Sequence, residues 1–258
     1  MKKILNISLV VLCFCCIISC TQEEKTTKNE VLVLGTIHSG HLTKEEYSIE
    51  KLTKLIKEIK PDIILTEIPP DRFEAAVAGF KKDDSISEPR VMRFPEYTDV
   101  IFPLSKTMDF EIIPTAGWTR PMAMERQKKL RAISQDSTRT KDWQQYMNAG
   151  KITDSLMTVI GKEYDPYFIH TSTYDSIYNI SLDVYNKLFN VELGLGGWDN
   201  INIAHYWNIE KALEKHRHQN KRILITYGAG HKGWFLKELR KRDDIELLEM
   251  KPFLDKIQ

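Results

Sequence analysis

Two histidines and one glutamate in this sequence each follow directly on a short apolar run. His38 and His231 both lie three residues after a glycine that ends such a run, and Glu67 closes a third run. Two imidazoles and one carboxylate match the three-ligand sets of hydrolytic metal sites, which leave one coordination position open for water. A divalent cation lowers the pKa of that water to about 7. The three residue types therefore indicate metal-assisted hydrolysis, provided that the fold brings them together.

Short, wholly apolar runs predict strands that are buried on both faces, as in parallel sheets. Amphipathic helical periods separate these runs, and this alternation predicts an α/β fold with a largely parallel central sheet flanked by helices. The carboxyl ends of parallel strands meet at one edge, where such folds bind their ligands. We therefore expect the three side chains to converge in one pocket. The strands are expected at 31–35, 62–67, 110–114, 223–227 and 246–250.

Helical periods dominate the middle of the chain, where the strand signal disappears. The stretch 121–190 predicts a helical insertion or cap over the carboxyl edge of the sheet, with one long helix at 122–147. This helical stretch could select the substrate, or it could serve only to pack against the sheet. Thr43 with Glu46 forms a capping box that predicts the start of an earlier helix. Further helices are expected at 73–80, 96–108, 200–218 and 234–242.

Other polar residues near the strand ends could assist His38, Glu67 and His231. His41 could support them or add a ligand, and Arg120 could neutralise the negative charge that develops on an oxyanion, with Arg72 a weaker candidate. Each residue also has a structural alternative: a hydrogen-bonded histidine, a surface arginine pair, or a glutamate that caps the next helix. The repeated strand–Gly-x-x-His unit favours a shared site for the set. The histidines that lack this context are His170, His205, His216 and His218.

The N-terminal segment has the features of a bacterial lipoprotein signal. Two lysines precede an apolar run at 4–18, which ends in the sequence Ile-Ile-Ser before Cys20. We expect a signal peptide at 1–19, lipidation of Cys20, a polar tether at 20–29 and an α/β domain at 30–258. The alternative is an ordinary signal peptide that leaves Cys20 as a free thiol. The expected location is the cell envelope, with a lipid anchor in the outer membrane or at the cell surface.

Composition excludes several classes of function. The chain has 258 residues and a formal charge of +1, so it lacks the basic excess of a nucleic-acid-binding protein. All four cysteines lie within the first twenty residues. The domain that follows therefore has no disulfide, thiolate metal site or cysteine nucleophile.

The sequence resembles the TraB/GumN family, which includes the Tiki proteases and the pheromone-shutdown proteins. The resemblance rests on the two Gly-x-x-His units, on Glu67 with Pro70 and Arg72 behind it, and on the Asn-x-x-Ile-Ala stretch that begins at Asn200. Asp199 stands where the family usually has an arginine. The family belongs to a broader group with the erythromycin esterases and the ChaN-like haem-binding lipoproteins.

The resemblance implies a metal-dependent hydrolase with His38, Glu67 and His231 as active-site residues and metal ligands. For Tiki-like members it implies proteolysis with manganese or cobalt, so we expect a divalent metal ion (manganese, cobalt or zinc-like) and a peptide or small-molecule substrate. Two alternatives remain open. One is a haem- or ligand-binding lipoprotein of ChaN-like type, in which a histidine or tyrosine would ligate iron. The other is a non-catalytic surface protein that sequesters a peptide.

Overall fold

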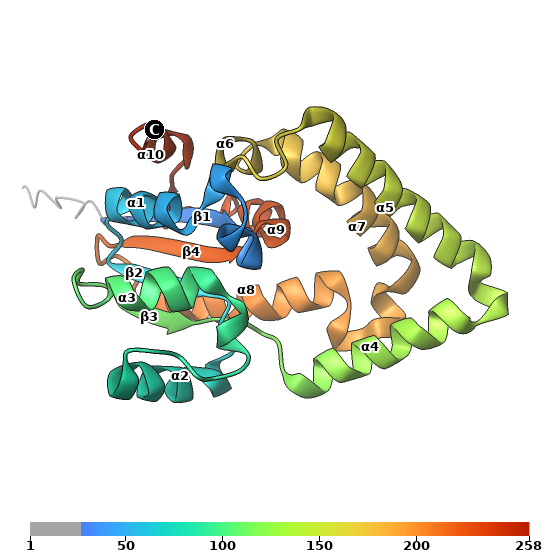
Figure 1. Ribbon diagram of the computed structural model, residues 1–258, viewed down its shortest axis with the longest axis horizontal. Coiled ribbons are helices and arrows are strands. Elements are labelled where there is room, and N and C mark those ends of the chain that lie inside the picture. The colour runs from blue at the N-terminus through green and yellow to red at the C-terminus, as the bar shows by residue number, and fades with distance from the viewer. Residues whose placement is uncertain (1–26, 258) are drawn as a thin grey trace, which may run out of the picture.

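A five-stranded, all-parallel sheet flanked by helices forms the centre of the molecule (Figure 1). The computed structural model describes residues 27–257, so the expected signal peptide, Cys20 and most of the tether lie outside the described residues. The predicted α/β fold is confirmed. The strand order is β3-β2-β4-β1-β5. The strands are β1 (Asn29–Thr36), β2 (Ile63–Thr66), β3 (Glu111–Pro114), β4 (Arg222–Gly228) and β5 (Ile245–Leu247).

The late strand β4 lies between the two earliest strands. It pairs with β1 in a register that places Thr36 opposite Gly228, and with β2 in a register that places Thr66 opposite Thr226. Thus β1 and β2 are not neighbours, although all three strands end at the same edge. The residues that follow these three strands consequently meet at that edge.

Helices cover both faces of the sheet, and the side chains of each strand alternate between these two faces. Leu32 and Leu34 of β1 pack into a hydrophobic cluster with helix α1 (Ile49–Ile59). Val31 and Val33 pack on the opposite face against α8 (Trp198–Lys215) and α9 (Ala229–Leu239). This two-sided burial is what the wholly apolar runs predict. The other helices are α2 (Pro70–Asp83), α3 (Phe102–Leu104), α4 (Arg120–Gln135), α5 (Thr140–Ile160), α6 (Pro166–Ile169), α7 (Ser172–Leu193) and α10 (Lys251–Leu254).

Helices α4 to α7 form the predicted helical segment, which extends beyond the carboxyl ends of the strands (Figure 1). The segment has its own small core, in which Ile133 of α4 packs with Phe189 of α7. The single helix predicted at 122–147 is instead two helices. The first helix ends before Asp136, whose carboxylate accepts a hydrogen bond from the backbone N–H of Thr138. In the described part of the chain, none of the helices combines the length and the apolar character needed to cross a membrane.

Three local predictions need correction. Helix α1 begins after Ser48 instead of Thr43, because short 3-10 turns occupy the preceding residues and the Ser48 hydroxyl accepts from the backbone N–H of Lys51 at 3.3 Å. The helix expected at 96–108 is a π-helix, Glu96–Ile101, followed only by α3. Pro103 in α3 has no N–H with which to continue α-helical hydrogen bonding. His231 lies in the first turn of α9 and not in a loop before it.

Candidate metal centre

Glu67 stands at the centre of the polar group at the carboxyl edge of the sheet. It follows β2 directly, and its side chain is buried. One carboxylate oxygen, Oε2, accepts a hydrogen bond of 3.0 Å from the backbone N–H of Gly228, at the start of α9. Its own backbone N–H donates to the Tyr97 hydroxyl at 2.7 Å, and that hydroxyl donates to the carbonyl of Thr226. The start of α9, which carries the partial positive charge of a helix N-terminus, therefore faces this carboxylate.

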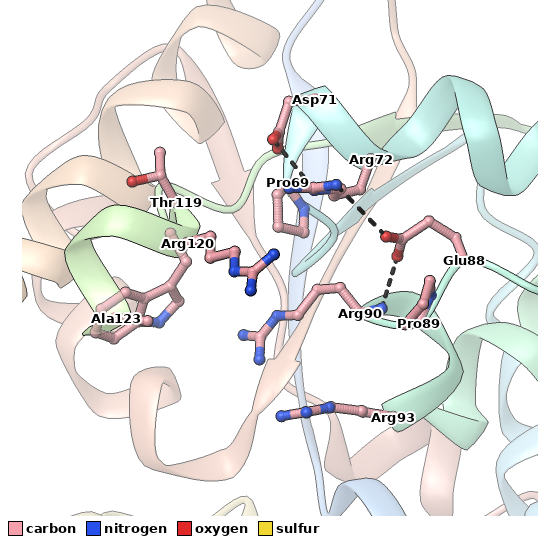
Figure 2. A pocket seen from close by; sticks show the side chains of 11 residues that line it. Pro69, Asp71, Arg72, Glu88, Pro89, Arg90, Arg93, Thr119, Arg120 and Ala123 are labelled. Atoms are coloured by element: carbon pink, nitrogen blue, oxygen red, sulfur yellow. Dashed lines mark hydrogen bonds and ion pairs between the residues drawn. The ribbon is translucent and has the colours of Figure 1, made fainter. Parts of the chain in front are cut away.

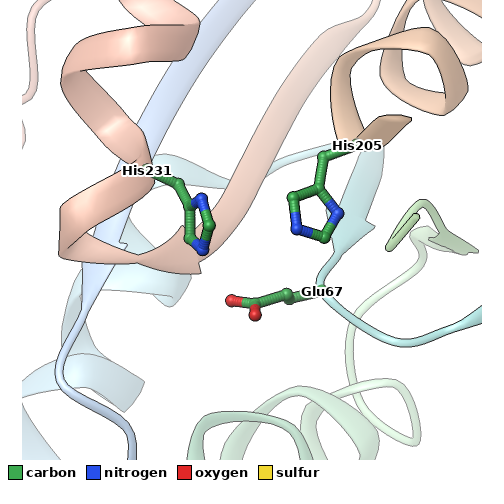
Figure 3. A group of neighbouring side chains, drawn as sticks. All are labelled: Glu67, His205 and His231. Atoms are coloured by element: carbon green, nitrogen blue, oxygen red, sulfur yellow. The ribbon is translucent and has the colours of Figure 1, made fainter. Parts of the chain in front are cut away.

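Two histidines face Glu67 (Figure 3). Glu67, His205 and His231 are all buried, and each offers a ligand atom that lies within 4.8 Å of the other two. This group could hold a metal ion. Sequence reasoning identified two of its members and missed His205.

His231 presents a free ring nitrogen to this group. Its Nδ1 lies 2.7 Å from Oδ1 of Asn202, and the Asn202 amide nitrogen donates to the carbonyl of Trp198. This second bond orients the amide so that its oxygen accepts from the ring, which places the ring proton on Nδ1. Burial lowers the pKa of His231, and the Trp198 ring stacks on the imidazole at 4.6 Å. The Nε2 lone pair of the neutral ring is therefore available to a cation.

His38 has the same arrangement on the other side of Glu67. Its Nδ1 lies 2.6 Å from Oε1 of the buried Glu96, and the Thr36 hydroxyl donates to the same oxygen. Its Nε2 lies 3.8 Å from Oε2 of Glu67. Burial opposes protonation of His38, but the hydrogen bond to Glu96 and the two nearby carboxylates outweigh it and raise its pKa. The backbone of His38 adopts φ 49°, a left-handed conformation that is uncommon for non-glycine residues and clusters at functional sites.

The glycines of the two Gly-x-x-His units have a packing reason. A Cβ atom on Gly228 would lie 2.5 Å from Nε2 of His38, and one on Gly35 would lie 3.1 Å from the Cα of Ala229. Each glycine therefore makes room for the other unit, and only the absence of a side chain permits this close approach. The repeat predicts a shared site because the two units are in contact.

His205 differs from the other two histidines in its hydrogen bonding. The backbone N–H of Gly117 donates to its Nδ1 at 2.7 Å, so the proton of the neutral ring must be on Nε2. That Nε2 is buried and has no hydrogen-bond partner among residues 27–257, and burial lowers the pKa of the ring well below its ordinary value. His205 thus presents an N–H donor to the group. Asn202 and His205 lie three residues apart on one face of α8, but this spacing alone does not indicate a site.

The remaining histidine near the site, His41, has a structural role. Its Nε2 accepts from the backbone N–H of Ile37, and its Nδ1 donates to the carbonyl of Tyr47. With both nitrogens engaged by the backbone, His41 has no lone pair for a cation. It holds the turns that follow β1 and so positions His38.

Arg120 and Arg72 lie apart from the three acid–base side chains. Arg120 is the first residue of α4 and is exposed, and both arginines line a neighbouring cavity of about 410 Å³ (Figure 2). Arg72 pairs with Asp71 at 3.2 Å. The structure therefore brings His38, Glu67 and His231 to one edge, but it places Arg120 in the wall of an adjoining space.

Comparison of the chain with models of known protein families, with curated proteins and with solved structures gives no match.

Proposed function

We propose that this chain is a metal-dependent hydrolase that acts on peptide bonds or on small molecules with related bonds. The observation that carries the proposal is the orientation of two imidazoles around Glu67. His38 and His231 each direct Nδ1 to an oxygen acceptor and leave Nε2 free. In proteins, metal-binding histidines almost always donate their other ring N–H to a carboxylate or a carbonyl oxygen. This pattern supports His38, Glu67 and His231 as the ligand set, with a manganese, cobalt or zinc-like ion.

The residues of the site have separate roles in this proposal. His38 and His231 would hold the cation with neutral imidazole nitrogens, and Glu67 would supply the carboxylate. When bound, a divalent cation supplies a Lewis acid and lowers the pKa of water to about 7. His205 would donate its Nε2–H to an oxygen of the substrate or of the attacking water, since that proton has no partner within the described residues. Such a preorganised donor stabilises negative charge that develops in acyl transfer.

Membership of the TraB/GumN family and attachment to the cell envelope through lipidated Cys20 belong to the same proposal. The supporting features are the two Gly-x-x-His units, Glu67, and the basic and apolar start of the sequence before Cys20. A cell-envelope hydrolase would meet its substrate outside the cytoplasm.

The test is hydrolysis of a library of internally quenched peptides by metal-stripped protein to which Mn²⁺, Co²⁺ or Zn²⁺ is returned. Activity should require a metal and should fall at least a hundredfold in His38→Ala, Glu67→Gln and His231→Ala. His218→Asn is the matched control, because His218 is exposed and has a left-handed φ that asparagine tolerates. Activity that persists in the three site variants would contradict the proposal. A haem Soret band without hydrolysis would instead favour the haem-binding alternative.

A further inference from the structure

A second polar site adjoins the candidate metal centre. The cavity of about 410 Å³ lies between the start of α2, the segment 88–93 and the start of α4. Four arginines and two acidic residues contribute to its lining, so four positive charges face two negative ones and leave a net charge of two. The arginines are Arg72, Arg90, Arg93 and Arg120, and the acidic residues are Asp71 and Glu88.

The two carboxylates are already occupied. Arg72 pairs with Asp71 at 3.2 Å and lies 3.9 Å from Glu88. The second carboxylate oxygen of Glu88 accepts hydrogen bonds from the backbone N–H groups of Arg90 and Val91, both at 2.8 Å. Glu88 therefore serves to fold its own loop, and neither acid neutralises the other three arginines.

Three guanidinium groups are left without an anion. Within residues 27–257, no ion pair joins Arg90, Arg93 or Arg120 to a carboxylate, and Figure 2 shows all three pointing into the same space. Like charges that converge in this way repel one another unless an anion lies between them. A guanidinium offers a planar fork of donors that matches the oxygens of phosphate and carboxylate groups. The geometry is therefore that of an oxyanion receptor.

The N-terminus of α2 increases the preference for a multiply charged anion. Pro69 before α2 makes no side-chain cap, whereas the Thr119 hydroxyl caps α4 by accepting from the backbone N–H of Met122. A helix N-terminus with free N–H groups binds phosphate and sulfate groups readily. The lining also includes the apolar side chains of Trp118, Pro89 and Ala123, which an organic group could contact.

The cavity is connected to the candidate metal centre through shared residues. The Trp118 ring lies 6.4 Å from that of His205, and the preceding residue, Gly117, hydrogen bonds to His205. On the other side, the Arg90 guanidinium lies 5.1 Å from the Phe94 ring, whose centroid lies 4.8 Å from that of His38. A ligand held in the cavity would thus contact residues that pack against His205 and, through Phe94, against His38.

We propose that this cavity binds the phosphoryl group of an organic phosphate, with Arg90, Arg93 and Arg120 on its oxygens and the organic group against Trp118. A phosphoryl dianion matches three unpaired guanidinium groups and the uncapped N-terminus of α2 better than a single carboxylate does. The binding requires no metal. That the bound molecule is also the substrate rests on the proposed hydrolase function.

The test measures binding of phenyl phosphate, benzoate and phenol to the metal-stripped full-length protein by calorimetry. Phenyl phosphate should bind at least tenfold more tightly than benzoate, and phenol should not bind detectably. Arg90→Gln, Arg93→Gln and Arg120→Gln should each weaken phenyl phosphate binding about tenfold or more, since each removes a charge-assisted contact. Circular dichroism would establish that each variant is folded.

The matched control is Arg131→Gln, which removes an arginine from α4 outside this cavity and should leave the affinity unchanged. Binding that is equally weak for all three probes, or that is insensitive to the three arginine variants, would overturn the proposal. Because the measurement contains no metal, its outcome is independent of whether the protein hydrolyses anything. If the unaltered protein failed to bind phenyl phosphate but showed metal-dependent hydrolysis, only this inference would be refuted.

Discussion

Replacing Gly228 with alanine should disable the metal centre without unfolding the protein. Gly228 has φ −49° and ψ 135°, which alanine adopts without strain, and its backbone N–H would still donate to Glu67. The new Cβ would lie 2.5 Å from Nε2 of His38. An ordinary contact is at least 3.4 Å, so the ring must retreat by about 0.9 Å (3.4 minus 2.5). A ligand that is displaced by this much loses its bond to a shared cation.

We expect Gly228→Ala to weaken Zn²⁺ or Mn²⁺ binding about 10- to 100-fold, measured by competition with a chromogenic chelator. A loss of about one kcal/mol in the free energy of unfolding should accompany it, because alanine is a poorer N-cap than glycine. Gly230→Ala, in the first turn of α9, is the control: its Cβ would crowd the Tyr178 ring of α7 without touching His38. If Gly228→Ala retained full metal affinity, His38 would not be a ligand and the assignment would fail.

Three further predictions concern pH and stability. The pKa of His170 is lowered by burial from 6.5 to about 4, so the folded protein binds fewer protons than the unfolded chain between these values. The free energy of unfolding should therefore fall by up to about 3 kcal/mol as the pH drops through this range. Urea titrations of His170→Gln should show a smaller fall. Equal falls in the two proteins would contradict the lowered pKa of His170. Gly150→Ala should raise the free energy of unfolding by about 0.5–1 kcal/mol, because the new Cβ in the middle of α5 would meet no atom within 4 Å. A urea titration that shows a destabilised variant would contradict this prediction. The pKa of His38 is raised by Glu96, so metal binding near pH 6.5 should release a proton from this ring. Calorimetry in two buffers of different ionisation enthalpy should detect that proton. The Glu96→Gln variant should release less, and identical proton release in the two proteins would count against this role of Glu96.

The sheet and part of the site are predictable because their signals are local. Wholly apolar runs specify buried strands, and a histidine shortly after such a run is expected at the carboxyl edge of the sheet. The insertion of β4 between β1 and β2 has no such signal, since strand order depends on pairing between distant segments, such as those of Asp62 and Arg222, which are 160 residues apart. The shared edge was nevertheless predictable, because it requires only that the strands be parallel.

The supporting residues could not be read from local patterns. Glu96 orients His38 from 58 residues away, and Gly117 fixes the tautomer of His205 from 88 residues away. Neither Glu96 nor His205 stands at a strand end, so neither has the context that identified Glu67. Arg120 was predicted to act on an oxyanion at the metal centre. Its position at the start of α4 instead associates it with the other arginines of the neighbouring cavity.

The ligand set of the metal centre is tested most directly by a crystal structure of the Zn²⁺-loaded protein, with the ion located by anomalous scattering. We expect one peak about 2.0–2.2 Å from Nε2 of His38, a carboxylate oxygen of Glu67 and Nε2 of His231, with a fourth position open. Nδ1 of His205 should still accept from the backbone N–H of Gly117. A peak bonded to His205 while His38 is not coordinated, or the absence of any peak at Glu67, would show that this ligand set is wrong.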